Sequence, residues 1–115
     1  MSRDLLFLTG TRADFGKLEP LAAAARDAGM SVGFFVTGMH MLERYGLTRQ
    51  EVRRMPGVRT QEFLNQRAGD PQDIVLAKTV TGFSDHVAEH RPDLIVTHGD
   101  RVEALAGTLV AATNY

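Results

Sequence analysis

The chain has 115 residues, of which 43% are hydrophobic, and it carries 13 Lys and Arg against 14 Asp and Glu, for a formal net charge of -1. This composition fits one globular domain, and without a dense basic run it gives no electrostatic basis for binding nucleic acid or an anionic membrane. The absence of Cys excludes disulfides and thiolate metal ligands, and the apolar runs are too short for a signal peptide or a membrane span, so we expect a cytoplasmic protein.

Short apolar runs at residues 5–8, 32–36 and 94–96 predict strands, and a weaker run at 58–64 predicts another. The strong runs are near-continuous Leu, Phe, Val and Ile, which is typical of strands covered on both faces, as in a parallel sheet. We expect the first strand to lie in the centre of that sheet.

The segments between these runs predict helices. One is expected over residues 18–28, with Pro20 in its first turn or at a kink and Gly29 as its C-terminal stop. A capping box from Thr48 to Glu51 predicts a short helix that ends before Pro56.

The clearest helical pattern lies between Pro71 and Pro92. Asp70 is expected as the N-cap of this helix and Pro71 as its first residue. The apolar positions that define its buried stripe are Leu76, Val80, Phe83 and Val87. A last helix, rich in Ala and Leu, is predicted over residues 101–113, with no strand after it.

Strands and helices thus alternate along the chain. This order predicts right-handed crossovers in an open, doubly wound parallel sheet, an α/β fold of the Rossmann-like class. Such sheets bind ligands beyond the carboxyl ends of their strands. The turns that follow residues 8, 36 and 96 are therefore the candidate sites.

The first of these turns carries Gly10, Arg12 and Lys17. Backbone N–H groups and two cations at the start of a helix could bind an anion. The alternative is an ordinary turn with solvated charges. The glycine spacing matches neither a Walker A loop nor a Gly-x-Gly-x-x-Gly fingerprint, which argues against a nicotinamide cofactor.

The second and third turns carry side chains that can move protons. His40 could bond a substrate hydroxyl or phosphate, or transfer a proton, or it could be an ordinary surface histidine. Asp100 could act as a base or orient a sugar, with Gly99 allowing a close backbone approach. Alternatively, Asp100 and Glu103 could simply cap the last helix.

His86 and His90 stand four residues apart on the predicted third helix and could face one metal ion. No third ligand is evident, and the acidic residues beside them indicate a solvated face. We therefore expect no metal site.

Three segments together resemble the UDP-N-acetylglucosamine 2-epimerase family, and most closely its hydrolysing branch. They are residues 9–18 (TGTRADFGKL), 36–41 (VTGMHM) and 98–107 (HGDRVEALAG). The resemblance implies the N-terminal half of a two-domain enzyme of the GT-B type. Residues 1–115 would then form an incomplete Rossmann-like domain, without the second, nucleotide-gripping domain.

The resemblance also implies the reaction. UDP leaves C1 of the sugar as C2 loses its proton, and water adds to the glycal-like intermediate, which gives N-acetylmannosamine and UDP without a cofactor, as in sialic acid biosynthesis. The residues expected at the site are Asp100 as the catalytic residue and Gly10, Arg12, Lys17, His40, Arg101 and Glu103 as substrate-binding residues. The family's later glutamates have no counterpart here, so we expect the isolated chain to be inactive.

Other functions stay open at this point. The substrate could instead be a related UDP-diamino-sugar, or the chain could be a non-catalytic module that binds a phosphorylated ligand. Half of a glycosyltransferase would share the architecture but not the turn at residues 10–18. We also expect a homo-oligomer, because an incomplete sheet leaves apolar surface that a partner would cover.

Overall fold

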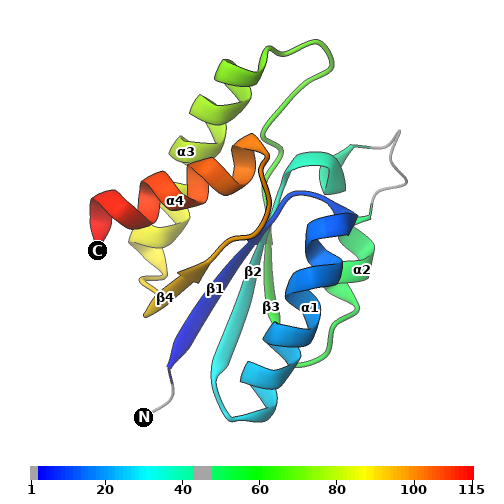
Figure 1. Ribbon diagram of the computed structural model, residues 1–115, viewed down its shortest axis with the longest axis vertical. Helices are drawn as coiled ribbons and strands as arrows, with labels where there is room; N and C mark the ends of the chain where they lie inside the picture. Colours follow the sequence, from blue (N-terminus) through cyan, green and yellow to red (C-terminus); the bar gives the residue numbers. More distant parts are fainter. Residues whose placement is uncertain (1–2, 43–47) are drawn as a thin grey trace.

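The computed structural model describes residues 3–42 and 48–115. A four-stranded sheet forms its middle layer, with helices on both faces (Figure 1). The elements in chain order are β1 (Asp4–Thr9), α1 (Arg12–Asp27), β2 (Ser31–Val36), the 3-10 helix η1 (Gly38–Met41), α2 (Arg49–Arg53), β3 (Arg59–Glu62), α3 (Gln72–Glu89), β4 (Leu94–Val96) and α4 (Val102–Asn114).

The strands are parallel and lie in the order β3-β2-β1-β4. β1 therefore lies inside the sheet, between β2 and β4, as the sequence predicts. The weak run also forms a strand, β3, at one edge. The predicted α/β, Rossmann-like parallel sheet is confirmed.

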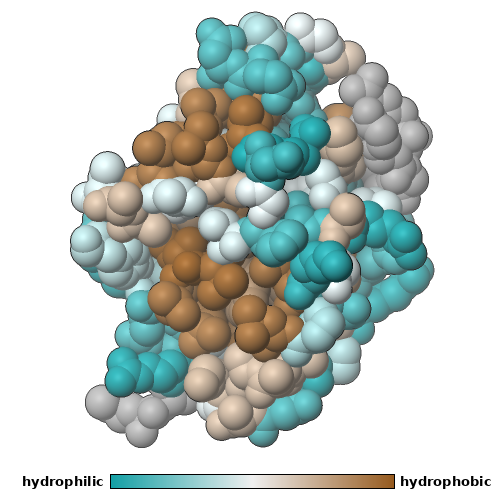
Figure 2. Space-filling model, viewed as in Figure 1, coloured by the Kyte–Doolittle hydropathy of each residue, from teal (hydrophilic) through white to brown (hydrophobic). Residues whose placement is uncertain are grey.

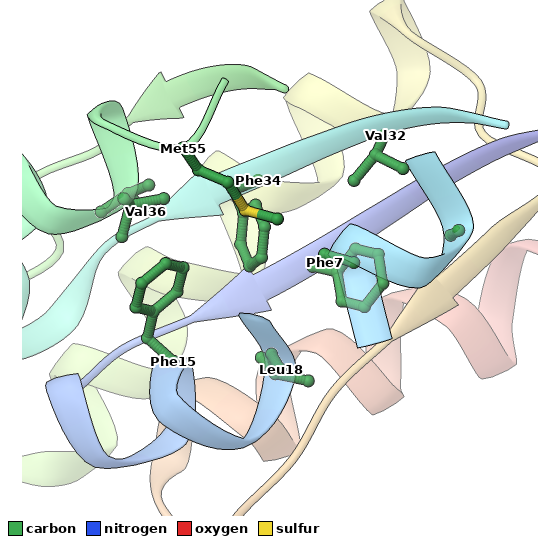
Figure 3. Packing of buried hydrophobic residues seen from close by; sticks show 10 residues of the cluster. Phe7, Phe15, Leu18, Val32, Phe34, Val36 and Met55 are labelled. Atoms are coloured by element: carbon green, nitrogen blue, oxygen red, sulfur yellow. The ribbon is translucent and has the colours of Figure 1, made fainter. Parts of the chain in front are cut away.

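Alternate strand residues pack against two separate helix layers. On the α1 and α2 face, Phe7 and Phe34 stack with ring centroids 5.1 Å apart, and Phe15 meets Phe34 edge-on at 5.4 Å (Figure 3). On the α3 and α4 face, the buried cluster comprises Leu6, Leu8, Phe35, Phe83, Val87 and Val110. Both faces of the central strands are thus covered, which is why their sequences are apolar without alternation.

The helix boundaries differ from the predicted ones where side chains find other partners. α1 begins at Arg12, earlier than predicted, because Thr11 and Asp14 form a capping box, and Pro20 lies inside the helix beyond its first turn. The end of α1 is as predicted, with Gly29 at a φ of 91°. The predicted capping box at Thr48 is absent, although Thr48 does precede α2.

The predicted N-cap of α3 is wrong, and the alternative of a helix cap at Asp100 is not found at α4. Pro71, not Asp70, is the N-cap of α3. The Asp70 carboxylate instead accepts hydrogen bonds from the Arg67 N–H and the Lys78 ammonium, both at 2.9 Å. At α4 the N-cap is Arg101, so Asp100 lies one residue before the N-cap.

Apolar side chains remain on the surface near α4 and the β4 edge of the sheet (Figure 2). Leu94 is 55% exposed and Leu105 is 48% exposed. Within the described ranges, no helix is both long enough and apolar enough to cross a membrane.

Candidate functional site

The segments that follow all four strands meet at the carboxyl edge of the sheet, as its parallel topology requires. A cleft of about 430 Å³ lies between the turn after β1 and the turn after β4, with Met39 from the segment after β2 at its side. Of the predicted site residues, the cleft is lined by Gly10, Lys17, Asp100, Arg101 and Glu103. Arg12 and His40 do not line it.

In the turn after β1, the Asp14 carboxylate accepts hydrogen bonds from the turn's own backbone and hydroxyl groups. Oδ2 of Asp14 accepts hydrogen bonds from the backbone N–H of Gly10 at 3.1 Å and of Thr11 at 3.0 Å, and from the Thr11 hydroxyl at 3.1 Å. Oδ1 of Asp14 accepts from the Thr9 hydroxyl. The expectation that this turn offers free backbone N–H groups to an external anion is therefore wrong for Gly10 and Thr11.

His40 lies behind the cleft, fully buried at 0% exposure. Its Nε2 lies 2.9 Å from the Thr9 hydroxyl and its Nδ1 2.8 Å from the Thr48 hydroxyl. Burial lowers the pKa of His40, against the opposing effect of the nearby Asp14 carboxylate, so the ring is neutral at pH 7. Because the Thr9 proton is donated to Asp14, Thr9 accepts from Nε2–H of His40, and Nδ1 accepts from Thr48.

This arrangement gives His40 a structural role in the ligand-free protein. It links the end of β1 to the N-cap of α2 through the hydroxyl groups of the buried Thr9 and the half-buried Thr48. The hypothesis of a surface histidine is wrong. Contact between His40 and a substrate stays a prediction.

Arg12 points away from the cleft. Its Nε donates to both carboxylate oxygens of Glu51 on α2, at 3.1 and 2.9 Å, and its side chain is 74% exposed. The predicted convergence of Arg12 with Lys17 and Asp100 is thus not found. A role for Arg12 in binding stays a prediction.

Asp100 lies in the loop between β4 and α4, in which Gly99 has a φ of 111°. The residue is exposed and lines the cleft. Since Arg101 is the N-cap of α4, the structure does not support the helix-cap alternative for Asp100. His98, which the sequence argument left without a role, lines the same cleft beside it.

Glu103 lines the cleft but is buried, with only 3% of its side chain exposed, and both of its carboxylate oxygens bond to protein groups. Its Oε1 accepts from Nε of Arg101 at 3.0 Å, and its Oε2 accepts from the side-chain amide of Asn65 at 3.2 Å. Asn65 was missed in the sequence, because it follows the weakest strand and belongs to no motif there. Only its burial in the folded chain identifies it.

The two helical histidines lie away from this cleft. The ring centroids of His86 and His90 are 4.7 Å apart, and both line a pocket of about 120 Å³ with residues near the amino ends of the strands, such as Gly33 and Arg59. In the part of the chain that the structure describes, no group of three or more metal-ligating side chains comes together.

A parallel α/β sheet with a cleft at its carboxyl edge, lined in part by charged side chains, defines a Rossmann-like domain. Residues 22–115 match the family described as UDP-N-acetylglucosamine 2-epimerase, and the chain belongs to this family.

Individual relatives agree with this assignment. The chain is 47% identical over 109 residues to a UDP-N-acetylglucosamine 2-epimerase of Neisseria meningitidis, covering 94% of the chain and 29% of that protein. It is 28% identical to a hydrolyzing UDP-N,N'-diacetylbacillosamine 2-epimerase of Legionella pneumophila, covering 96% of the chain and 30% of the relative.

The fold has solved counterparts. The crystal structure of UDP-GlcNAc 2-epimerase from Neisseria meningitidis bound to UDP-GlcNAc superposes with a TM-score of 0.77 at 16% identity, covering 94% of this chain and 29% of that one. The chain thus spans less than a third of the length of the relatives it matches.

Proposed function

We propose that this chain is an incomplete N-terminal domain, residues 1–115, of a hydrolysing UDP-N-acetylglucosamine 2-epimerase. The parent enzyme would convert UDP-N-acetylglucosamine and water to N-acetylmannosamine and UDP. The observation that carries this proposal is one cleft that brings the Asp100 carboxylate together with the cations of Lys17 and Arg101.

The reaction needs two kinds of group in that cleft. When the C1–O bond breaks, its electron pair leaves with UDP, so negative charge grows on the diphosphate, where cations stabilise it. The C2 proton goes to a base and its electron pair forms the C1–C2 double bond. Water then adds its hydroxyl to C1, and a proton returns to C2 from the opposite face.

The described residues suit these roles in different ways. Lys17 is exposed at the cleft, and Arg101 presents its guanidinium there, so both can face a diphosphate. Among the described residues, no group bonds to the Asp100 carboxylate, which leaves it free to accept a proton. Because Asp14 already occupies the N–H groups of Gly10 and Thr11, we assign the diphosphate to the side chains and not to that turn.

A UDP-diamino-sugar is the second candidate substrate. It is favoured by the similarity to the Legionella pneumophila protein, whose name specifies N,N'-diacetylbacillosamine. Both substrates would undergo the same elimination and hydration. They differ in the sugar ring, so a substrate comparison separates them.

The test uses the full-length parent with each UDP-sugar. UDP release and the sugar product are followed by coupled assay and NMR. Faster turnover of UDP-N-acetylglucosamine, with N-acetylmannosamine as product, supports the proposal, and faster turnover of the diamino-sugar supports the second candidate. Binding of UDP without turnover of either sugar would identify a non-catalytic module. The 115-residue chain alone should release no UDP.

Substitutions in the parent assign the roles. Asp100→Asn should reduce kcat by about a hundredfold or more while keeping much of the substrate affinity, because a proton-transfer group is lost. Asp85→Asn, an exposed carboxylate on α3, is the matched control and should leave kcat unchanged. Lys17→Ala should weaken binding as well as turnover, because a cation beside a diphosphate acts in both states. Near-normal kcat for the Asp100 variant would remove it as the base.

A further inference from the structure

Two buried polar side chains, Asn65 and Glu103, lie behind the cleft where the turns meet. Asn65 follows β3 and is 0% exposed, and Glu103 stands in the first turn of α4 and is 2% exposed. Burying such groups is unfavourable unless hydrogen bonds replace the lost water. Their partners therefore show what the burial stabilises.

Asn65 uses its whole side-chain amide. Its Oδ1 accepts from the backbone N–H of Gly38 at 3.1 Å, and its Nδ2 donates to Thr79 Oγ1 at 2.8 Å and to Glu103 Oε2 at 3.2 Å. A reversed amide would set donor against donor at Gly38 and acceptor against acceptor at Glu103, so one orientation is fixed. Asn65 thereby ties the turn after β2 to α3 and α4.

Glu103 in turn fixes the side chain of Arg101, which lines the cleft. Oε2 is held by Asn65, and Oε1 accepts from Nε of Arg101 at 3.0 Å. The Arg101 side chain is 34% exposed and lines the cleft. No acceptor among the described residues bonds its Nη groups, so these donors stay available while Nε is held by Glu103.

The carboxylate of Glu103 has little room to move. A Cβ placed on Gly10 would lie 2.9 Å from Oε1 of Glu103, and one placed on Gly38 would lie 3.2 Å from its Cδ. The glycine backbones of two turns thus enclose the carboxylate. A carboxylate enclosed in this way can hold the neighbouring Arg101 side chain more readily than it can rotate toward a substrate.

We propose that Asn65 and Glu103 are positioning residues that set the Arg101 guanidinium to receive the diphosphate, and that Glu103 itself does not contact the substrate. The inference rests on the proposed function for the identity of the anion. An arginine side chain that is already held in one rotamer binds phosphate through its fork of donors and loses little conformational entropy on binding. The buried pair of Asn65 and Glu103 would strengthen phosphate binding in this way.

The test is a double-mutant cycle in the full-length parent, with UDP as the probe in calorimetry and with kcat and KM measured separately. Glu103→Gln keeps the side-chain shape but turns an N–H donor or a neutral oxygen toward Arg101. We expect this variant and Arg101→Ala each to weaken UDP binding by about tenfold or more, the scale of a charge-assisted hydrogen bond. In the Arg101→Ala background, Glu103→Gln should weaken UDP binding by no more than about twofold.

Two further variants keep the test decisive. Glu89→Gln removes an exposed carboxylate of α3 and should leave UDP affinity unchanged. Arg101→Lys keeps the charge, loses the fork of donors and leaves the side chain of Glu103 unchanged. It should weaken UDP binding by about tenfold or more, and this can be measured even if Glu103→Gln unfolds.

Several results would overturn the inference. Effects of Glu103→Gln and Arg101→Ala that multiply in the double variant would show that the two residues act independently. A loss of kcat with unchanged UDP affinity would place Glu103 in the chemistry itself. Normal UDP binding by Arg101→Lys would show that orientation is unimportant. If the variants show the expected coupling between Glu103 and Arg101 in UDP binding, but the wild-type parent turns over neither UDP-sugar, only the proposed function fails.

Discussion

Replacing Gly38 with alanine tests how closely the turns after β1 and β2 approach each other. Gly38 has a φ of 62°, a conformation that costs alanine about 1 kcal/mol. A Cβ there would lie 2.6 Å from the Gly10 carbonyl oxygen and 3.0 Å from its Cα. These are backbone atoms that cannot rotate away, so overpacking adds about 1–3 kcal/mol.

The free energy of unfolding should therefore fall by about 2–4 kcal/mol. Urea denaturation followed by far-UV circular dichroism measures it, and with a slope of about 1.5 kcal/mol/M the midpoint should fall by about 1.3–2.7 M.

Gly29→Ala is the matched control, because Gly29 has a φ of 91° but nothing within 4 Å of a Cβ. It carries only the conformational term, about 1 kcal/mol, and should lower the midpoint by about 0.7 M. A Gly38→Ala midpoint no lower than that of Gly29→Ala would refute the close approach of the two turns.

Three further outcomes are expected. Burial lowers the pKa of His40 below 6.5, so below that pH the unfolded chain binds a proton that the folded chain does not. The free energy of unfolding should therefore be highest above pH 6.5 and fall by up to about 1.4 kcal/mol per pH unit as acid is added. In His40→Gln this dependence on pH should be shallower. An unchanged slope in His40→Gln would contradict this. His86→Gln tests the same effect at a second histidine, because burial lowers the pKa of His86 as well. Asp14→Ala should lower Tm by about 10 °C, because it frees several donors at the start of α1, whereas the exposed Asp73→Ala should have a much smaller effect; a similar loss in both would show that the turn does not depend on the carboxylate. Sedimentation at high micromolar concentration should show self-association through the surface near Leu94 and Leu105, weakened by Leu105→Glu, and a monomer under these conditions would count against it.

The layers of the fold were predictable because they depend on patterns that many residues share. The runs at β1 and β2 are apolar on both faces, and their side chains pack against helices on each side of the sheet, whereas Leu94 of β4 is exposed. Gly29 ended α1 as expected because few other residues adopt its backbone conformation readily. These features follow from local chemistry, without knowledge of distant contacts.

Features that depend on one distant partner were not predictable. Thr48 has the sequence context of a capping box, yet its hydroxyl bonds to His40, eight residues away. Asp70 stands just before Pro71, the N-cap of α3, but its carboxylate bonds to Lys78 instead of capping the helix. In each case a tertiary hydrogen bond replaced the local one that the sequence favours.

The candidate site divides in the same way. The parallel topology places the turns carrying Lys17 and Asp100 at one edge, which the element order predicts. The direction of Arg12 depends on Glu51, and the role of Glu103 depends on Asn65. Those pairings join segments far apart in the chain, and no spacing within one motif reveals them.

The carboxylate of Asp14 gives the start of α1 a resident counter-ion. The positive end of the helix is therefore neutralised in the ligand-free protein. A free oxyanion at this place would have to displace the bonds from Gly10 and Thr11 and approach a fixed negative charge. Sulfate or phosphate from a buffer should consequently compete poorly here, and a crystal grown from ammonium sulfate should carry its ordered anions beside Lys17 or Arg101 and not at the start of this helix.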